Sequence, residues 1–189
     1  MIGVAQDVYD LYLAKQVQQW THGLDPYVAM AQWNAEEGSS GNWPGHNPAG
    51  IRPGNTAVDA LANGVNQAGF DTFTNDITGA QAYATLINTD KNYAGIRQSI
   101  KAGTPQAELA AIAASPWDTG HYGGSGQNLF ASYASVTGNK VTDPLAPAST
   151  GAQTSSGGQS SSTGATLPKN ALEYALLGIG GVILLTALL

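Results

Sequence analysis

Two adjacent carboxylates, Glu36 and Glu37, stand where a predicted helix ends in front of Gly38. The negative end of the helix dipole opposes a carboxylate at this position. Trp33 precedes the pair by three and four residues, so on a helix its indole lies beneath both and removes water. Both effects raise the pKa of a carboxyl group, and an acid that is still protonated near neutral pH can protonate a leaving sugar oxygen. The alternative is a buried helix that ends in solvated acids.

The helix that carries these carboxylates has clear boundaries in the sequence. Asp25 is suited to cap the first free N–H groups, and Pro26 suits the first helical position. Gly38 is the natural residue for leaving the helix. Adjacent side chains on a helix point about 100° apart, so only one of the two carboxylates faces a cleft.

Other helices are expected before and after this segment, with one short extended piece. The apolar periodicity and the Gly and Pro positions predict a mainly α-helical fold with little or no β structure. The predicted helices cover Gly3–Trp20, Pro26–Glu37, Thr56–Val65, Thr78–Asn88, Asn92–Gly103, Pro105–Ala114 and Gln127–Val136, and the extended piece covers Gly69–Phe73.

The loop after the carboxylates carries Trp43 and the segment His46–Ile51, which reads His-Asn-Pro-Ala-Gly-Ile. A Glu-Gly pair at a helix end, followed by a short loop and Asn-Pro-x-Gly-Ile, resembles the lysozyme-like superfamily, in its peptidoglycan glucosaminidase and transglycosylase branch common in bacteriophages. Further matching elements are Phe-x-x-Phe, Asn-Tyr, Ala-Gly and Ser-Pro-Trp-x-Thr-Gly-x-Tyr, in the same order over residues 25–123. The resemblance implies a lysozyme-like helical domain over residues 1–143.

The resemblance also implies an activity and a set of site residues. The expected reaction cleaves the peptidoglycan glycan strand between N-acetylmuramic acid and N-acetylglucosamine. Glu37 matches the catalytic acid of the Glu-Gly members, whereas alignment on the Glu-Ser-Gly form selects Glu36. The expected substrate-binding residues are Trp33, Trp43, Asn47, Gly50, Trp117, Asp118 and Tyr122. For the aromatic residues at 43, 117 and 122, packing in the core is the alternative to stacking on sugar rings.

A second catalytic carboxylate is not well matched. Asp118 lies in the closing motif, but the family's usual acid falls one or two places later, at Gly120. A missing second acid favours a lytic transglycosylase, in which the substrate's own 6-hydroxyl attacks and one Glu serves as acid and then as base. Hydrolysis, including hydrolysis assisted by the substrate's N-acetyl group, stays open.

Composition limits the other classes of function. The 189 residues carry a formal net charge of −6 and include no Cys and three His. The His residues have no metal-ligand spacing, so we expect neither a metal nor a cofactor. No basic stripe is present, which argues against nucleic acid as a partner.

The last part of the sequence differs from the rest. Residues 144–168 are rich in Ser, Thr, Gly and Ala, which predicts a flexible linker. Residues 169–189 predict a single transmembrane helix that contacts lipid through residues 171–189, with a buried helix of the globular domain as the alternative. The first residues do not have the pattern of a secretory signal peptide.

Together these features resemble the virion transglycosylases of membrane-containing phages. The expected setting is the internal membrane of a virion, or the host membrane during assembly, with local opening of the wall for genome delivery. The expected partners are peptidoglycan strands, the membrane, and other virion membrane or capsid proteins. One alternative is a phage lysis glycosidase that acts at the end of infection. The other is a non-catalytic, membrane-anchored virion protein with a structural or glycan-binding role.

Overall fold

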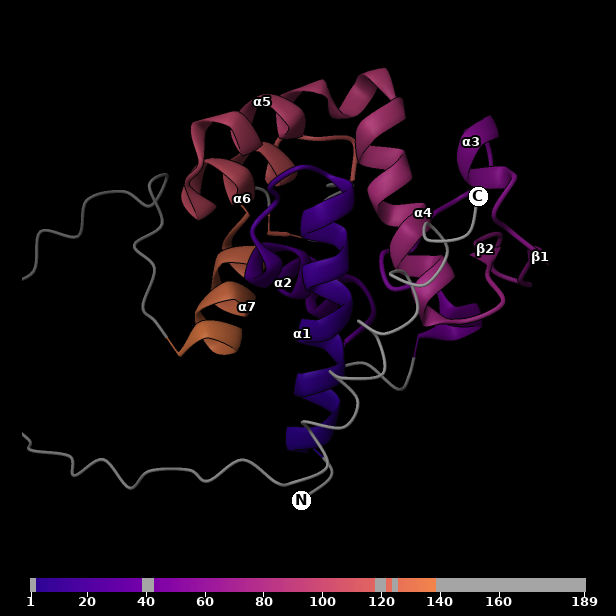
Figure 1. The fold of residues 1–189 in the computed structure, drawn as a ribbon, viewed down its shortest axis with the longest axis horizontal. Coiled ribbons are helices and arrows are strands. Elements are labelled where there is room, and N and C mark those ends of the chain that lie inside the picture. Colours follow the sequence, from indigo (N-terminus) through magenta and orange to yellow (C-terminus); the bar gives the residue numbers. More distant parts are fainter. Residues whose placement is uncertain (1–2, 39–42, 118–121, 124–125, 139–189) are drawn as a thin grey trace, which may run out of the picture. The chain divides into compact units, whose positions relative to one another are not determined.

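The computed structural model of the chain describes residues 3–38, 43–117, 122–123 and 126–138, with side chains from residue 7 onward. All of them belong to one compact unit, which is mainly α-helical with a small hairpin (Figure 1). Its elements are α1 (Gly3–Trp20), α2 (Pro26–Glu37), the 3-10 turn η1 (Pro44–His46), α3 (Thr56–Asp59), β1 (Gly64–Val65), β2 (Asp71–Thr72), α4 (Asp76–Thr89), the 3-10 turn η2 (Lys91–Tyr93), α5 (Ala94–Ala102), α6 (Pro105–Ala113) and α7 (Gln127–Thr137).

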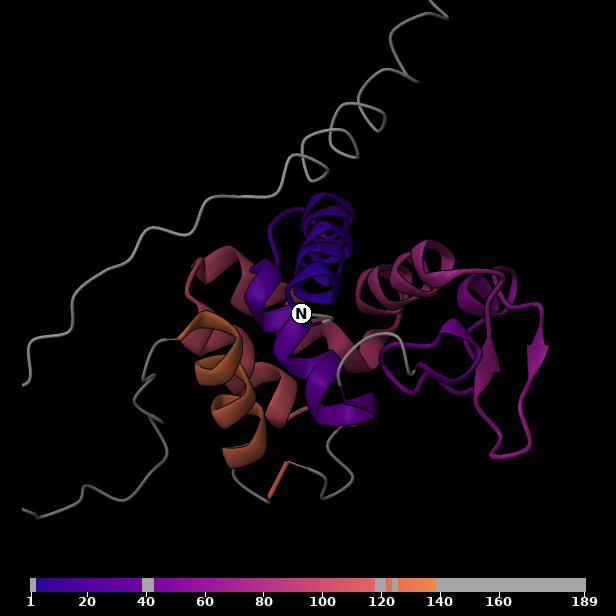
Figure 2. The same cartoon turned by 90° about the horizontal axis from the view of Figure 1, so that it is seen from below.

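Helix α2 is the centre of this arrangement. It contacts α1, α6 and α7, while α1 also packs against α4, and α5 packs against α6. Strands β1 and β2 pair antiparallel, and with α3 they lie on the side of the unit opposite α7 (Figure 2). The C-terminal end of α2 therefore lies between a helical part, made of α5 to α7, and a smaller part that includes the hairpin.

The sequence explains where α2 begins and ends. The Asp25 carboxylate accepts hydrogen bonds from the backbone N–H groups of Tyr27, at 2.8 Å, and Val28, at 3.2 Å. Pro26 occupies the first turn, where no N–H donor is needed. The helix ends at Gly38, whose φ of 77° is a conformation that favours glycine.

The boundary between α5 and α6 follows the same local rules. Gly103 ends α5 in the left-handed conformation with a φ of 69°. The next residue, Thr104, caps α6 by accepting a hydrogen bond from the Ala107 N–H at 3.4 Å, and Pro105 follows in the first turn. The two helices therefore meet in a sharp corner that local chemistry specifies.

Aromatic side chains dominate the core around α2. Trp33 is 1% exposed and packs edge-on against Trp43 and Tyr83, with ring centroids 5.3 and 5.8 Å apart. The Tyr83 hydroxyl donates a hydrogen bond of 2.7 Å to Oε1 of Gln32, which is itself fully buried. This packing fixes α4 against the middle of α2.

The predicted mainly helical class is confirmed, and two local predictions are corrected. The helix predicted over Thr56–Val65 ends at Asp59, because Asn63 donates its N–H to the carbonyl of Thr72 and residues 64–65 pair with β2. The helix predicted over Asn92–Gly103 begins as the separate turn η2, because Asp90 caps that turn by accepting the Asn92 N–H at 2.8 Å.

The predictions for the end of the chain fall on residues that the structure does not describe. These are the last residues of the predicted domain over 1–143, the linker over 144–168 and the membrane helix over 169–189. Within the described ranges, none of the helices combines the length and the apolar character of a membrane span.

Candidate functional site

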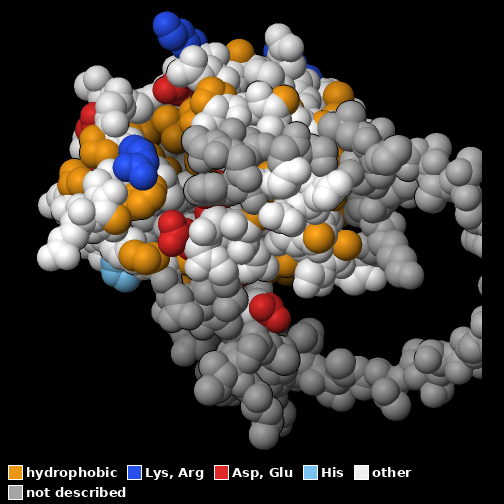
Figure 3. Space-filling model, turned by 180° about the vertical axis from the view of Figure 1, so that it is seen from behind, with side chains coloured by type: hydrophobic (Ala, Val, Ile, Leu, Met, Phe, Trp, Pro, Cys, Tyr) orange, Lys and Arg blue, Asp and Glu red, His pale blue; other side chains and the backbone are white. Residues whose placement is uncertain are grey.

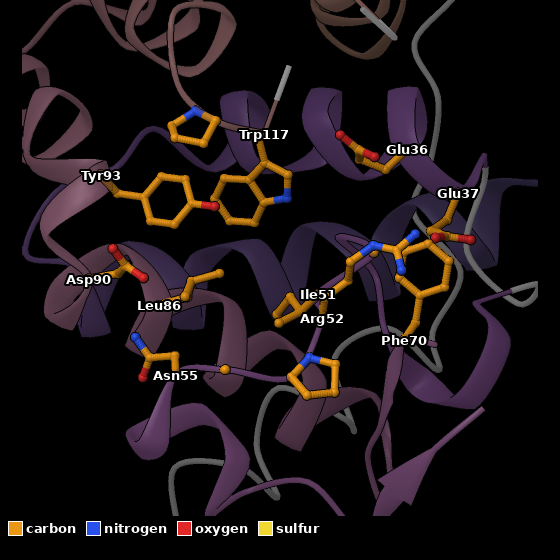
Figure 4. A pocket seen from close by; sticks show the side chains of 14 residues that line it. Glu36, Glu37, Ile51, Arg52, Asn55, Phe70, Leu86, Asp90, Tyr93 and Trp117 are labelled. Carbon is orange, nitrogen blue, oxygen red and sulfur yellow. The ribbon is translucent and has the colours of Figure 1, made fainter. Parts of the chain in front are cut away.

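An open cleft of about 540 Å³ lies at the C-terminal end of α2 (Figure 4). Its lining residues come from α2, from the loop after η1, from the hairpin turn, from α4 and η2, and from the segment after α6. They are Glu36, Glu37, Gly50, Ile51, Arg52, Pro53, Gly54, Asn55, Phe70, Leu86, Asp90, Tyr93, Pro116 and Trp117. On the face of the molecule drawn in Figure 3, acidic and hydrophobic side chains lie close together and basic side chains are few.

Glu36 and Glu37 both line one end of the cleft, which corrects the prediction that only one of them faces it, and both side chains are partly buried. Burial raises the pKa of the Glu37 carboxyl, and the neighbouring negative charge of Glu36 raises it further. The direction and the effect of burial agree with the prediction from the sequence, and the second cause is the charge of Glu36 and not the helix dipole. Glu37 is thus favoured to hold its proton to a higher pH than an ordinary glutamate.

Glu36 has a different environment, because it is engaged from the core side. The hydroxyl of Tyr122, a fully buried residue, donates a short hydrogen bond to Oε1 of Glu36. Burial, and then the charge of Glu36, raise the pKa of the Tyr122 hydroxyl far above its ordinary value, so this group remains a hydrogen-bond donor. The two adjacent glutamates are therefore distinguished by their partners.

The loop beside the carboxylates is fixed by Asn47. Its buried amide donates to the carbonyls of Ile51 and Asp71 and accepts from the Ile51 N–H, each at 2.9 Å. The neighbouring carbonyl of Ala49 accepts a 2.9 Å hydrogen bond from the indole N–H of Trp117. These bonds tie the loop to β2 and to the segment after α6.

Gly50 lies within this loop and faces the carboxylates. Its φ of 58° is in the left-handed region, which favours glycine. A Cβ at this position would lie 3.3 Å from Oε1 of Glu37, 3.7 Å from Oε2 of Glu36 and 3.6 Å from a ring carbon of Phe70. The missing side chain therefore leaves the space in front of the acids open.

The other side of the loop rests directly on α4. A Cβ on Gly79 would lie 1.9 Å from the carbonyl oxygen of His46, so the two backbones are in contact. His46 itself has a φ of 58°, and its Nδ1 lies 2.7 Å from Oδ1 of Asp76. Helix α4 thus contacts the loop through Gly79 and Asp76 and limits its movement.

The far end of the cleft is aromatic and polar. The rings of Tyr93 and Trp117 pack together with centroids 4.7 Å apart, and Asp90, Asn55 and Leu86 lie near them (Figure 4). Trp117 is only 8% exposed, so it presents an edge and little more to the cleft. This end offers an apolar wall with hydrogen-bonding groups at its margin.

The structure brings together some of the residues predicted from the sequence. Those that line the cleft are Glu36, Glu37, Gly50 and Trp117. Those that are buried behind it are Trp33, Trp43, Asn47 and Tyr122, and the most exposed of them, Trp43, is 7% exposed. Rings at this depth have no face to offer a sugar, so for Trp43 and Tyr122 the packing alternative describes the structure. Asp118 lies outside the described residues.

Several lining residues were not selected from the sequence as site residues. Arg52 and Phe70 are the most notable, because the Arg52 guanidinium carbon lies 4.1 Å from the centroid of the Phe70 ring. Arg52 directly follows the Asn-Pro-x-Gly-Ile segment, which was the available signal for it. Asn55, Asp90 and Tyr93 join the site only through the fold.

The site combines a half-buried acid of raised pKa, a second carboxylate held by a tyrosine, and a cleft open to a ligand. Such a site can donate a proton to a bound ligand and stabilise a nearby positive charge. In the part of the chain that the structure describes, no three His, Cys, Asp or Glu side chains are grouped as a metal site requires. Comparison with protein-family models, with curated proteins and with solved structures gave no match to this chain.

Proposed function

We propose that this protein cleaves the glycan strand of peptidoglycan as a lytic transglycosylase, with Glu37 as its general acid. The observation that carries the proposal is the Glu37 carboxyl itself. It lies at one end of an open cleft, and burial and the adjacent Glu36 raise its pKa. A general acid for glycoside cleavage needs access to the substrate together with a pKa raised above that of an ordinary carboxyl group.

The proposed reaction needs one residue that acts twice. Glu37 donates its proton to the glycosidic oxygen as the bond from that oxygen to C1 of N-acetylmuramic acid breaks. The Glu37 carboxylate then takes the proton of the same sugar's C6 hydroxyl, whose oxygen bonds to C1 and closes a 1,6-anhydro ring. No water is consumed.

Glu36 has a supporting role in this proposal. With Oε1 held by the Tyr122 hydroxyl, its carboxylate is fixed beside Glu37 and does not compete for the leaving group. A fixed negative charge at this place stabilises the positive charge that develops on the sugar ring. The same charge raises the pKa of Glu37, so it also prepares the acid for its first step.

The finer assignment of the fold as lysozyme-like belongs to the same proposal. Its support is the order of elements along the chain: a helix that ends in the acid, an asparagine-fixed loop, a small hairpin and further helices. The cleft lies between the hairpin side and the helical side. A glycan strand is an extended ligand, and a cleft lined from both sides suits it.

The experiment compares two isosteric variants of the full-length chain on purified peptidoglycan. Loss of a general acid lowers the rate by about 10²- to 10⁴-fold, so Glu37→Gln should abolish release of soluble fragments over the time of the assay. Glu36→Gln should retain measurable activity. Both variants should melt as cooperatively as the unaltered protein, because an amide replaces an acid of the same shape.

Mass spectrometry of the released fragments tests the reaction type. The proposal predicts 1,6-anhydro ends. Reducing ends as the sole product would identify a hydrolase, and activity retained by Glu37→Gln but lost in Glu36→Gln would move the acid to Glu36. Full activity in both variants would reject the site.

The proposed setting is a phage virion. In it, residues 169–189 anchor the enzyme in a membrane, and residues 144–168 connect this anchor to the wall-cleaving domain. Its support is the sequence of those residues. Detection of the chain in purified particles tests this setting. Its absence from particles, combined with lysis at the end of infection, would favour the lysis glycosidase.

A further inference from the structure

Arg52 is held in the cleft by the turn of the hairpin. Its guanidinium carbon lies 4.1 Å above the centroid of the Phe70 ring. One of its terminal nitrogens donates a long hydrogen bond of 3.5 Å to the carbonyl of Ala68 and lies 3.4 Å from where a Cβ on Gly69 would stand. Contacts with Ala68 and Phe70 restrict a side chain that would otherwise move freely.

The turn that holds Arg52 is itself well defined. The side-chain oxygen of Asn66 accepts the backbone N–H groups of Ala68 and Phe70, each at 3.0 Å. The Asn66 N–H in turn donates to the Phe70 carbonyl at 2.8 Å. The Phe70 ring is therefore presented by a closed and hydrogen-bonded turn.

Among the described residues, no carboxylate forms an ion pair with Arg52. Among the described residues that line the cleft, it is the one basic side chain, and Glu36, Glu37 and Asp90 are the acidic ones. Within the described part of the chain, the one hydrogen bond of its guanidinium is that to Ala68. Arg52 is also exposed, so its remaining N–H donors are accessible to a ligand.

Gly50 lies between the acid and the ring on which Arg52 stacks. The place that a Gly50 Cβ would occupy is 3.3 Å from Glu37 Oε1 and 3.6 Å from a ring carbon of Phe70. The acid and the aromatic platform are therefore neighbours across one missing side chain, and the guanidinium lies on the platform. A ligand with its reacting oxygen at Glu37 has its adjacent substituents within reach of Arg52 (Figure 4).

We propose that Arg52, stacked on Phe70, is a binding site for a carboxylate carried by the sugar next to the bond that is cleaved. This inference rests on the proposed function. A guanidinium fork matches a carboxylate with two parallel hydrogen bonds, and stacking leaves the edge of the fork free to make them. In peptidoglycan the carboxylate has two sources: the lactyl group of N-acetylmuramic acid when the peptide has been removed, or the stem peptide when it is present.

The test measures kcat and KM of the full-length protein on four soluble substrates. They are glycan strands that carry stem peptides, strands freed of peptides by an amidase, and both after conversion of their carboxylates to neutral methylamides. Arg52→Gln is compared with Lys101→Gln, which removes the same charge from an exposed position in the last turn of α5 that does not line the cleft.

The unaltered protein should have a KM for carboxylate-bearing strands roughly five- to tenfold below that for their methylamides, since the pair is exposed and solvent weakens it. Arg52→Gln should remove this preference with little change in kcat, and Lys101→Gln should retain it. A preference confined to peptide-free strands identifies the lactyl carboxylate, and one confined to intact strands identifies the stem peptide.

An unchanged preference in Arg52→Gln would overturn the inference, and so would an equal loss of activity on all four substrates. Absence of cleavage by the unaltered protein would reject the proposed function instead. In that case co-sedimentation with insoluble walls, before and after methylamidation, tests carboxylate binding by Arg52 without catalysis. Binding that depends on both the carboxylates and Arg52 supports the site, and binding independent of either, or no binding, rejects it.

Discussion

Substitution of Gly50 by alanine separates the geometry of the site from the stability of the fold. An L-residue in the left-handed conformation costs about 1 kcal/mol, which corresponds to a melting temperature lower by about 4 °C for a domain of this size. At Gly50 the added Cβ also meets Oε1 of Glu37 at 3.3 Å, so the carboxylate must give way by a few tenths of an ångström. Since a displacement of 1 Å costs roughly 10²-fold in rate, we expect about tenfold lower activity.

Gly103 provides the matched control for this experiment. Its φ of 69° is close to the 58° of Gly50, but no atom lies within 4 Å of the Cβ that it would carry. Gly103→Ala therefore has the same backbone cost without a neighbour in the site. Thermal melts should give similar losses of stability for the two variants.

The assay is the initial rate of fragment release from peptidoglycan, measured at least 15 °C below the lower melting transition. Activity should fall only in Gly50→Ala. Equal rates for the two variants, at equal stability, would show that the space in front of Glu37 has no part in the reaction. The assignment of Glu37 as the acid would then lose its geometric basis.

Two further predictions concern the support of α2 and of the loop. Asn47→Ala removes three buried hydrogen bonds, to Ile51 twice and to Asp71, and should lower the free energy of unfolding by about 3 kcal/mol in urea titrations; a loss below about 1 kcal/mol would contradict the role of Asn47. Burial raises the pKa of Glu108 to about 7, although the hydrogen bond from the Asp25 N–H acts in the opposite direction. The folded state therefore binds this proton more tightly than the unfolded state does. The free energy of unfolding should fall as the pH rises from about 4.5 to 7. Glu108→Gln should remove this decline in stability, and an unchanged decline would show that Glu108 is not the group that causes it.

The helix boundaries were predictable wherever a local cap specified them. Asp25 with Pro26, and Thr104 with Pro105, place the starts of α2 and α6 by chemistry within one turn. The helix predicted over Thr56–Val65 was wrong at its end, because a partner far along the chain decided the conformation. Pairing of residues 64–65 with β2 is not visible in their own sequence.

The site was predictable only in part, for a related reason. The two glutamates follow from a helix end, which is local. Whether an aromatic ring faces a cleft or the core depends on contacts such as that of Trp33 with Tyr83, fifty residues later in the chain. Arg52 and Phe70 come together only because the hairpin turn folds back onto the loop. The pair could therefore not be predicted from any single stretch of the sequence.

The contact between Gly79 and the carbonyl of His46 has a consequence for how this protein can vary. Every amino acid other than glycine carries a Cβ, and at position 79 that atom would stand 1.9 Å from a backbone oxygen that has no rotamer to change. Relief requires movement of the loop that carries Asn47 and Gly50. Substitution at this position of α4 thus displaces the loop beside the carboxylates, and selection at this glycine acts on fold and site at once.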